Sequence, residues 1–153
     1  MGLVWDSVTE ARIKSLHPLI RDKATRFIKE AEKEGIYLRI TSGFRSFEEQ
    51  DGLFNSGKDV TNAKGGSSYH NYGLAIDVVE MVGGKPVWDS PNWPKIGKIG
   101  KAAGFEWGGD WNLKNSKMKQ DLPHFQITQG KTTKELLALH NAGKFTNGFL
   151  NIV

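Results

Sequence analysis

Hydrophobic positions recur along this chain at two different spacings, which together predict both helices and strands. Residues 20–35 carry apolar side chains at the helical spacing i, i+3, i+4, i+7, and Gly35 follows them. This pattern predicts an amphipathic helix that ends at the glycine. Further helices are predicted over residues 46–57, 92–104 and 132–143. The first and last of these open with a Ser or Thr three residues before a Glu, the signature of a capping box.

Short runs rich in β-branched and aromatic residues lie between these helices and predict strands. They cover residues 36–44, 73–81, 105–111 and 124–128, whereas residues 58–69 are polar and glycine-rich, and residues 83–91 contain turn signals. Helices and strands do not alternate in a regular βαβ rhythm. We therefore expect an α+β domain in which helices pack against one small, largely antiparallel sheet.

Composition narrows the possible functions of the chain. Its 153 residues, 38% of them hydrophobic and 25% charged, suit one globular domain with a real core. No apolar run is long enough to span a membrane. The chain contains no cysteine, so a metal ion would have to bind His, Asp or Glu. A net charge of +4 would suit an anionic polymer such as nucleic acid or bacterial cell wall. The Lys and Arg are scattered and form no dense basic run, so we expect neither nucleic acid nor a membrane as a partner.

The segment SSYHNYGLAID places two polar residues, His70 and Asp77, on either side of a glycine. Asp77 alternates with core-type residues along the predicted strand and lies beside the small Ala75, which leaves room on that face. A turn or bulge at Gly73 would bring His70 over the same face. A loop histidine and a strand aspartate bonded to the backbone would give the same pattern, and the residues alone leave both readings open.

The segment DLPHFQI adds a second histidine and a second aspartate. Pro123 excludes a helix interior, so His124 and Gln126 share one face of a short strand. Two histidines and one aspartate suit Zn²⁺, with a fourth position left for water. Asp121 would then be a carboxylate beside the metal, as a hydrolase needs for a general base.

A third segment, TSGFRSFEEQ, places Arg45 between a strand end and a capped helix. One interpretation is a surface salt bridge. The other is a fixed cation that polarises a scissile carbonyl and stabilises the developing oxyanion.

These three segments, in this order, resemble the blocks of the VanY-like D-alanyl-D-alanine carboxypeptidase family of zinc peptidases. SSYHNYGLAID fits the family's S-x-H-x-x-G-x-A-x-D pattern in full, and the stretch from residue 16 to residue 127 is most similar to the L-alanyl-D-glutamate endopeptidase branch, which includes phage endolysins. FEWGGDW is also typical of that branch. The resemblance implies the D,D-peptidase/hedgehog-like arrangement of a small sheet and helices, with a catalytic domain over residues 1–128 and an unassigned helix and tail over 129–153.

The resemblance also implies roles for individual residues. His70, Asp77 and His124 would bind Zn²⁺, Asp121 would act as the general base, and Arg45 would stabilise the oxyanion. Four further positions would support the site or contact the substrate: Ser68, Gln50, Trp111 and Tyr72. The vancomycin-resistance dipeptidases have Glu where this chain has Asp121, and wall-lytic members resembling this one have Asp.

The expected function is hydrolysis of the L-alanyl-D-glutamate bond in the stem peptide of bacterial peptidoglycan by a monomer. A D-alanyl-D-alanine carboxypeptidase and a non-catalytic zinc- or wall-binding module are the alternatives. A serine hydrolase would need a G-x-S-x-G elbow, which the chain lacks, and no acidic pair marks a glycosidase. The first residues show no secretory signal, which predicts an endolysin-type enzyme held in the host cytoplasm until its release to the wall.

Overall fold

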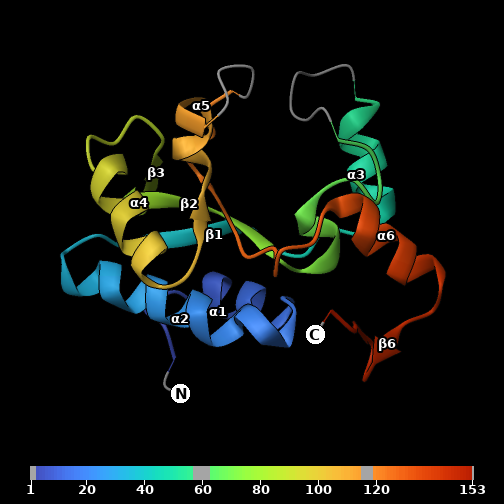
Figure 1. The fold of residues 1–153 in the computed structure, drawn as a ribbon. Helices are drawn as coiled ribbons and strands as arrows, with labels where there is room; N and C mark the ends of the chain where they lie inside the picture. The colour runs from blue at the N-terminus through green and yellow to red at the C-terminus, as the bar shows by residue number, and fades with distance from the viewer. Residues whose placement is uncertain (1–2, 57–62, 115–118, 153) are drawn as a thin grey trace.

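The computed structural model describes residues 3–56, 63–114 and 119–152. A mixed sheet-and-helix domain with antiparallel strand pairing confirms the predicted α+β class (Figure 1). The helices are α1 (Ser7–Lys14), α2 (Pro18–Lys33), α3 (Phe47–Phe54), α4 (Trp93–Ala102), α5 (Trp111–Lys114) and α6 (Thr133–Asn141), with the 3-10 turns η1 (Tyr69–Tyr72) and η2 (Gly108–Asp110).

The main sheet has the strand order β1-β2-β5-β4, and β3 pairs with the far end of β2. Its strands are β1 (Leu38–Ser42), β2 (Ala75–Val82), β3 (Lys85–Val87), β4 (Glu106–Trp107) and β5 (His124–Gln126), and a separate hairpin joins β6 (Phe145–Thr146) to β7 (Phe149–Leu150). Every pairing is antiparallel. β2 is therefore the central strand, with β1 along one edge and β5 and β3 along the other.

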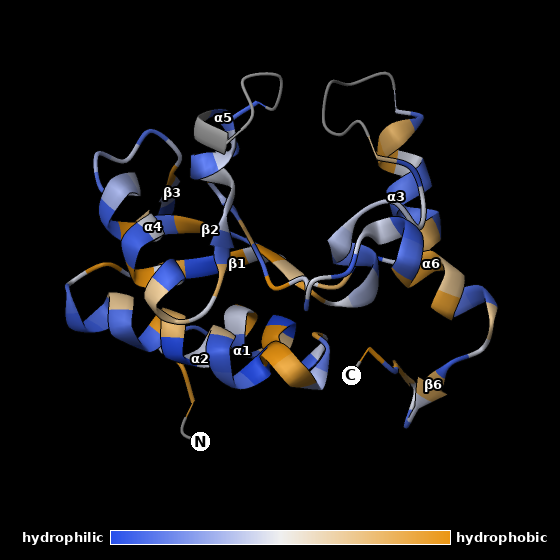
Figure 2. Ribbon diagram, in the orientation of Figure 1, coloured by the Kyte–Doolittle hydropathy of each residue, from blue (hydrophilic) through white to orange (hydrophobic). Residues whose placement is uncertain are grey.

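The core lies between one face of the sheet and the helices α1, α2 and α4. Phe27 from α2 and Phe125 from β5 are fully buried, with ring centroids 4.7 Å apart. Burying one such ring contributes roughly 1.5–3 kcal/mol to folding. Figure 2 shows hydrophobic residues along the central strands and hydrophilic residues on the outward sides of the helices. Alternation along β5 puts Phe125 in this core and sends its two neighbours to the opposite face.

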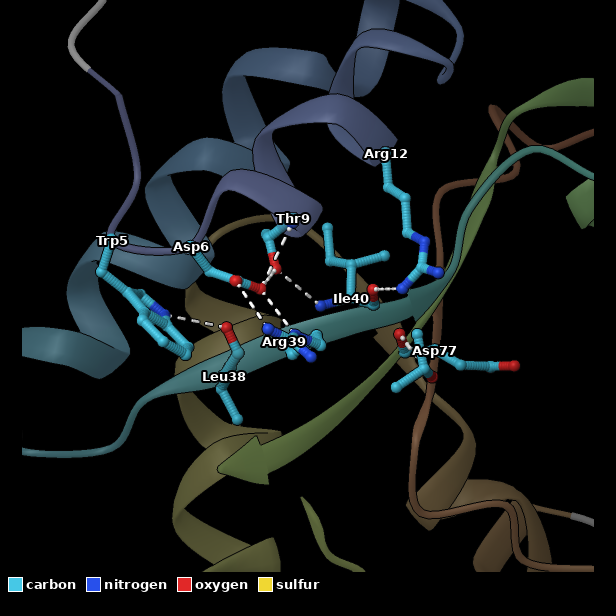
Figure 3. Close-up of polar contacts among 9 residues, drawn as sticks. Trp5, Asp6, Thr9, Arg12, Leu38, Arg39, Ile40 and Asp77 are labelled. Carbon is cyan, nitrogen blue, oxygen red and sulfur yellow. Dashed lines mark hydrogen bonds and ion pairs between the residues drawn. The ribbon is translucent and has the colours of Figure 1, made fainter. Parts of the chain in front are cut away.

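Helix α1 covers the open edge of β1, whose backbone groups would otherwise lack partners. Thr9 accepts a hydrogen bond from the Ile40 N–H at 3.0 Å, and Arg12 donates to the Ile40 carbonyl at 2.7 Å (Figure 3). Trp5 donates to the Leu38 carbonyl at 3.0 Å. Side chains thus replace a neighbouring strand and protect the edge from pairing with other chains.

The C-terminal segment packs onto the same core as the sheet. Leu136, Leu150 and Ile152 are buried within the main hydrophobic cluster. The His17 Nε2–H donates to the Leu150 carbonyl at 2.7 Å, and its Nδ1 accepts from the Leu19 N–H at 3.2 Å at the start of α2. The segment after residue 128 is therefore in contact with the elements that carry the proposed site.

Most predicted elements agree with the observed ones, and the differences have local causes. The capping boxes at Ser46 and Thr132 are present at the starts of α3 and α6. The stretch 83–91 was predicted as a turn, but it also contains β3, because Gly83 and Gly84 form a tight reversal that lets the chain pair back onto β2. Helices α1 and α5 and the β6–β7 hairpin were not predicted. Predicted loop positions 58–62 and the last predicted residue of α3, Gly57, lie outside the described residues.

Within the described ranges, no helix has the length and apolar character needed to cross a membrane.

The ion pair between Asp6 and Arg39 predicts a pH-dependent contribution to stability. Bonds of 2.9 Å from Arg39 lead the causes that lower the pKa of Asp6 from 3.8 to about 2, although burial opposes them. The folded-state pKa is depressed, so the stabilisation is present above the unfolded-state pKa and is lost as pH falls from about 4 to about 2. We expect Asp6→Asn, which can still cap α1, to lose up to about 2 kcal/mol at pH 7.

Denaturant unfolding at several pH values would measure this loss. The difference between the wild type and Asp6→Asn should shrink as the pH falls from about 4 to about 2, because only the wild type then protonates this carboxyl group. A difference that stays constant with pH would contradict the ion-pair explanation.

Candidate metal centre

His70 lies in the turn η1, which is capped at its start by Ser68 and ended by Gly73. The Ser68 side chain caps the turn and accepts a hydrogen bond from the His70 N–H at 3.2 Å. Gly73 ends the turn in the left-handed conformation, with φ of 69°. A Cβ at Gly73 would lie 2.6 Å from the His17 backbone nitrogen, so both the conformation and the close approach require glycine. This confirms the predicted turn that brings His70 round.

Asp77 and His124 face each other across the pairing of β2 and β5. They are Cα partners in the antiparallel register, and Asp77 Oδ1 lies 3.3 Å from His124 Nδ1. The same oxygen lies 3.4 Å from His70 Nε2. One ligand atom from each of the three residues therefore falls within 4.8 Å of the others, and among the described residues this is a group that could hold a metal ion.

Hydrogen bonds on the far sides of both imidazoles fix which ring nitrogens face Asp77. His70 Nδ1 lies 2.8 Å from the Gly43 carbonyl, which only accepts, so Nδ1 carries the hydrogen. His124 Nε2 lies 2.7 Å from the Gln126 side-chain oxygen and donates to it in the same way. The remaining ring nitrogens present lone pairs to the Asp77 Oδ1 atom, which is buried and accepts no hydrogen bond.

Three electron-rich atoms with no hydrogen between them repel one another unless a cation lies among them. The donor set is two neutral imidazoles and one carboxylate, which is the chemistry of a divalent-metal site. The outward hydrogen bonds match the pattern by which proteins orient metal-binding histidines. The residues present therefore fit a metal ion.

The two aspartates of the site have opposite electrostatic environments. Burial by itself would raise the pKa of Asp77, but the adjacent His124 and His70, when they are protonated, donate to it and hold its pKa well below the ordinary value. Asp121 is exposed, but neighbouring groups partly exclude water from its carboxyl, and this desolvation raises its pKa; the negative charge of Asp77 adds to the effect while the histidines oppose it. Asp77 is thus the better permanent anion and Asp121 the better proton carrier.

Asp121 is placed by a close contact between its backbone and η2. Its N–H donates to the Gly108 carbonyl at 2.9 Å, and its own carbonyl accepts from the His124 N–H at 3.2 Å. A Cβ at Gly108 would lie only 2.3 Å from the Asp121 carbonyl oxygen. The glycine in the predicted FEWGGDW segment therefore allows the turn carrying Asp121 to lie against η2.

Arg45 lies beside the group, with its guanidinium fixed by two neighbours. It donates to Gln50 Oε1 at 2.9 Å and to Ser42 Oγ at 2.8 Å, and Ser42 is the Cα partner of Asp77. Its backbone N–H donates to the His70 carbonyl at 2.9 Å. Within residues 3–56, 63–114 and 119–152, no carboxylate forms an ion pair with Arg45, so the surface salt bridge considered from the sequence is not observed.

The remaining predicted site residues differ in how close they come to the group. The Trp111 ring lies 5.1 Å from the His124 ring and is partly exposed. Gln50 is fully buried behind Arg45. Tyr72 is buried and donates to the Gly66 carbonyl at 2.7 Å, and its ring packs edge-on against Phe47. These contacts give Tyr72 a supporting role in the turn.

Sequence patterns did not identify three groups that complete the site. These are the Gly43 carbonyl, the Ser42 hydroxyl and the Gln126 amide, which orient His70, Arg45 and His124 respectively. Gln126 could have been found, because it lies two residues after His124 on the same strand face. Ser42 lies only three residues before Arg45, whereas the contact of Gly43 with His70 joins residues 27 positions apart, which no local spacing encodes.

A His-Asp-His group on the open face of a small antiparallel sheet, beside a carboxyl of raised pKa and a fixed guanidinium, is the arrangement of a metal-dependent hydrolase. Comparison of the sequence with protein families identifies the family of hydrolases to which the chain belongs. The chain belongs to the VanY family, described as D-alanyl-D-alanine carboxypeptidase, which matches residues 13–129.

Two curated relatives share substantial sequence identity with the chain. The peptidoglycan L-alanyl-D-glutamate endopeptidase CwlK of Bacillus subtilis (strain 168) is 41% identical over 127 residues, covering 73% of each chain. The L-alanyl-D-glutamate peptidase of Listeria phage A118 is 34% identical over 106 residues, which cover 67% of this chain and 36% of the phage protein.

Solved structures share the fold. The Serratia marcescens L-Ala D-Glu endopeptidase ChiX has a TM-score of 0.61 and 28% identity, covering 82% of this chain and 90% of its own. A vancomycin-resistance D,D-pentapeptidase VanY, solved with Zn(II), has a TM-score of 0.59 and 17% identity, covering 73% of this chain and 72% of its own. At that identity, the second likeness concerns the fold alone.

The turn before β2 can be tested by comparing two glycines. Gly35 and Gly73 both have positive φ, but a Cβ at Gly35 meets nothing within 4 Å, whereas one at Gly73 meets the His17 backbone. We expect Gly35→Ala to cost about 1–2 kcal/mol of unfolding free energy, the usual cost of the left-handed conformation. Gly73→Ala should cost more and should also weaken metal binding, because His70 must move with the turn.

Denaturant unfolding and metal titration of both variants measure the two effects. Equal losses of stability with unchanged metal affinity would show that Gly73 acts through its conformation alone.

Proposed function

We propose that this protein is a zinc-dependent peptidoglycan hydrolase that cleaves the L-alanyl-D-glutamate bond of the stem peptide. Membership of the VanY family supports the peptidase chemistry. The names of the Bacillus and phage relatives support the bond that is cleaved. Because its substrate is the wall, the enzyme acts there, and likeness to a phage peptidase favours a part in cell lysis.

The observation that carries the proposal is the convergence of lone pairs on Asp77 Oδ1. Zinc bonds of about 2.0–2.2 Å at tetrahedral angles separate two ligand atoms by roughly 3.3–3.6 Å. Asp77 Oδ1 lies 3.4 Å from His70 Nε2 and 3.3 Å from His124 Nδ1. These spacings support zinc ligation by the three residues. A zinc ion there would polarise the scissile carbonyl and acidify a water molecule.

Asp121 is the proposed general base. Its carboxyl has a raised pKa and lies on the turn that leads into His124. It accepts a proton from the attacking water and then donates that proton to the amine of the leaving group, so one residue serves both halves of the reaction. A carboxyl whose pKa is shifted toward neutrality performs the second transfer more readily.

Arg45 is the proposed oxyanion partner. As the amide carbonyl becomes tetrahedral, its oxygen gains negative charge, and a guanidinium already held by Gln50 and Ser42 needs little reorganisation to donate to it. Ser68 acts indirectly by capping the turn of His70. Trp111, beside His124, forms part of the wall that the substrate meets.

Digestion of purified peptidoglycan tests which bond is cleaved. We expect new D-glutamate amino termini, identified by mass spectrometry of labelled fragments, and no release of free D-alanine. Release of D-alanine without new D-glutamate termini would instead identify a D-alanyl-D-alanine carboxypeptidase, as the family description suggests. No cleavage of either bond by the zinc-loaded protein would favour a binding module.

Substitution of Asp121 separates metal binding from chemistry. Asp121→Asn nearly preserves the size of the side chain and leaves the three proposed ligands in place, so it should keep its zinc. It should nevertheless lose roughly 10²–10⁴-fold in rate, the usual contribution of a positioned general base. Paired measurements of zinc stoichiometry and cleavage rate give both values. Loss of zinc would make Asp121 a ligand, and a near-normal rate would assign the base to another group.

Two matched variants provide the contrast. His124→Ala should lose zinc affinity and activity together, since one protein ligand in three is removed. Arg45→Ala should retain zinc and lose roughly 10²–10³-fold in rate, as expected when one oxyanion donor is removed.

A further inference from the structure

A row of three side chains crosses the sheet beside the proposed metal ligands. Gln126 on β5 is the Cα partner of Ala75 on β2 and of Glu106 on β4. Alternation along β5 places Gln126 on the same face as His124, and both residues are buried. The small Ala75 leaves the Gln126 amide free to lie between His124 and Glu106.

Two hydrogen bonds link His124, Gln126 and Glu106, and the donor of each bond can be assigned. Gln126 Oε1 lies 2.7 Å from His124 Nε2, and Gln126 Nε2 donates to Glu106 Oε1 at 3.1 Å. An ionised carboxylate only accepts hydrogen bonds, so the NH₂ group of Gln126 must face Glu106. The amide oxygen must then face His124. The reversed amide would place its oxygen against the carboxylate, which is repulsive.

The orientation of the amide decides where the His124 proton lies. Because Gln126 presents an acceptor, Nε2 of His124 carries the hydrogen and Nδ1 keeps its lone pair toward Asp77. A reversed amide would donate to Nε2, move the hydrogen to Nδ1 and place it where a metal would bind. His70 differs, because a backbone carbonyl from Gly43 sets its protonated nitrogen and no side-chain change can reverse it.

We propose that Glu106 is a positioning residue of the metal centre, which fixes the Gln126 amide and through it the His124 tautomer that leaves Nδ1 free for the ion. Since the ion belongs to the proposed function, the inference rests on that function. It assigns a task to the glutamate of the FEWGGDW segment, which is not one of the three proposed ligands.

A purely structural role for Glu106 makes a different prediction. The residue is exposed on a two-residue strand, so its bond to Gln126 could serve only to hold β4 against β5. In that case its removal would lower the unfolding free energy and leave the His124 tautomer unchanged. The tautomer of the metal-free protein is therefore the decisive measurement.

The experiment compares four proteins. Glu106→Gln keeps the shape of the side chain but offers an oxygen or an NH₂ group, so it no longer dictates the Gln126 orientation. The exchanged double variant Glu106→Gln/Gln126→Glu places a carboxylate directly against His124 Nε2 and restores an obligate acceptor there. Glu30→Gln, on the exposed side of α2, removes an equal charge far from the site and is the control, alongside the wild type.

Two readouts are needed, and neither depends on activity. Long-range ¹H–¹⁵N correlation spectra of the imidazoles in the metal-free proteins identify the protonated nitrogen of His124. Chelator competition gives the zinc dissociation constant. We expect Nε2–H in the wild type and the control. Glu106→Gln should show a mixture of tautomers with zinc binding weakened about 10-fold to 100-fold, the usual effect of losing an outer partner of a metal-binding histidine. The exchanged variant should recover most of the affinity.

The possible failures are separable. An unchanged tautomer with unchanged zinc affinity in Glu106→Gln would overturn the inference and leave the proposed function standing. Weaker zinc binding that follows a loss of unfolding free energy, without a change of tautomer, would overturn it in favour of the structural role. A wild type that binds no zinc would remove the proposed function, and the spectra would still decide whether Glu106 controls the tautomer.

Discussion

The structure depends most on one buried oxygen, Asp77 Oδ1, which is approached by two imidazole nitrogens and accepts no hydrogen bond. Bringing three electron-rich atoms together costs free energy in the absence of a cation. The favourable interactions of the surrounding fold must compensate for that cost. The antiparallel register supplies the contact with His124, and the turn ended by Gly73 supplies the contact with His70. Such stored cost is expected where a protein is organised to bind a ligand.

Strand alternation couples the proposed site to the stability of the core. Phe125 is fully buried against Phe27, while its neighbours His124 and Gln126 point to the opposite face. A shift of β5 by one residue would expose the ring and bury the imidazole in the core. The hydrophobic effect therefore holds the ligand register in place, although none of the apolar residues takes part in the chemistry.

The two acidic residues of the site obtain different properties from nearly the same surroundings. Asp77 lies against both imidazoles and stays ionised, whereas partial desolvation near that negative charge raises the pKa of Asp121. The neighbouring charges thus separate a metal-binding carboxylate from a proton-transferring one. Proximity of Asp121 to the group comes from Gly108, whose missing side chain lets the two backbone segments meet.

Local sequence patterns were sufficient to predict α2, the capped starts of α3 and α6, the central strand β2 and the turn at Gly73, because each follows from residues only a few positions apart. The same patterns predicted the His70, Asp77 and His124 group, whose members the structure brings together. They did not predict that α1 covers the edge of β1, that Gly43 orients His70, or that Glu106 reaches His124 through Gln126. Those features were decided by the tertiary structure, since hydrogen bonds between segments distant in sequence depend on strand pairing and register, which short-range spacing does not contain.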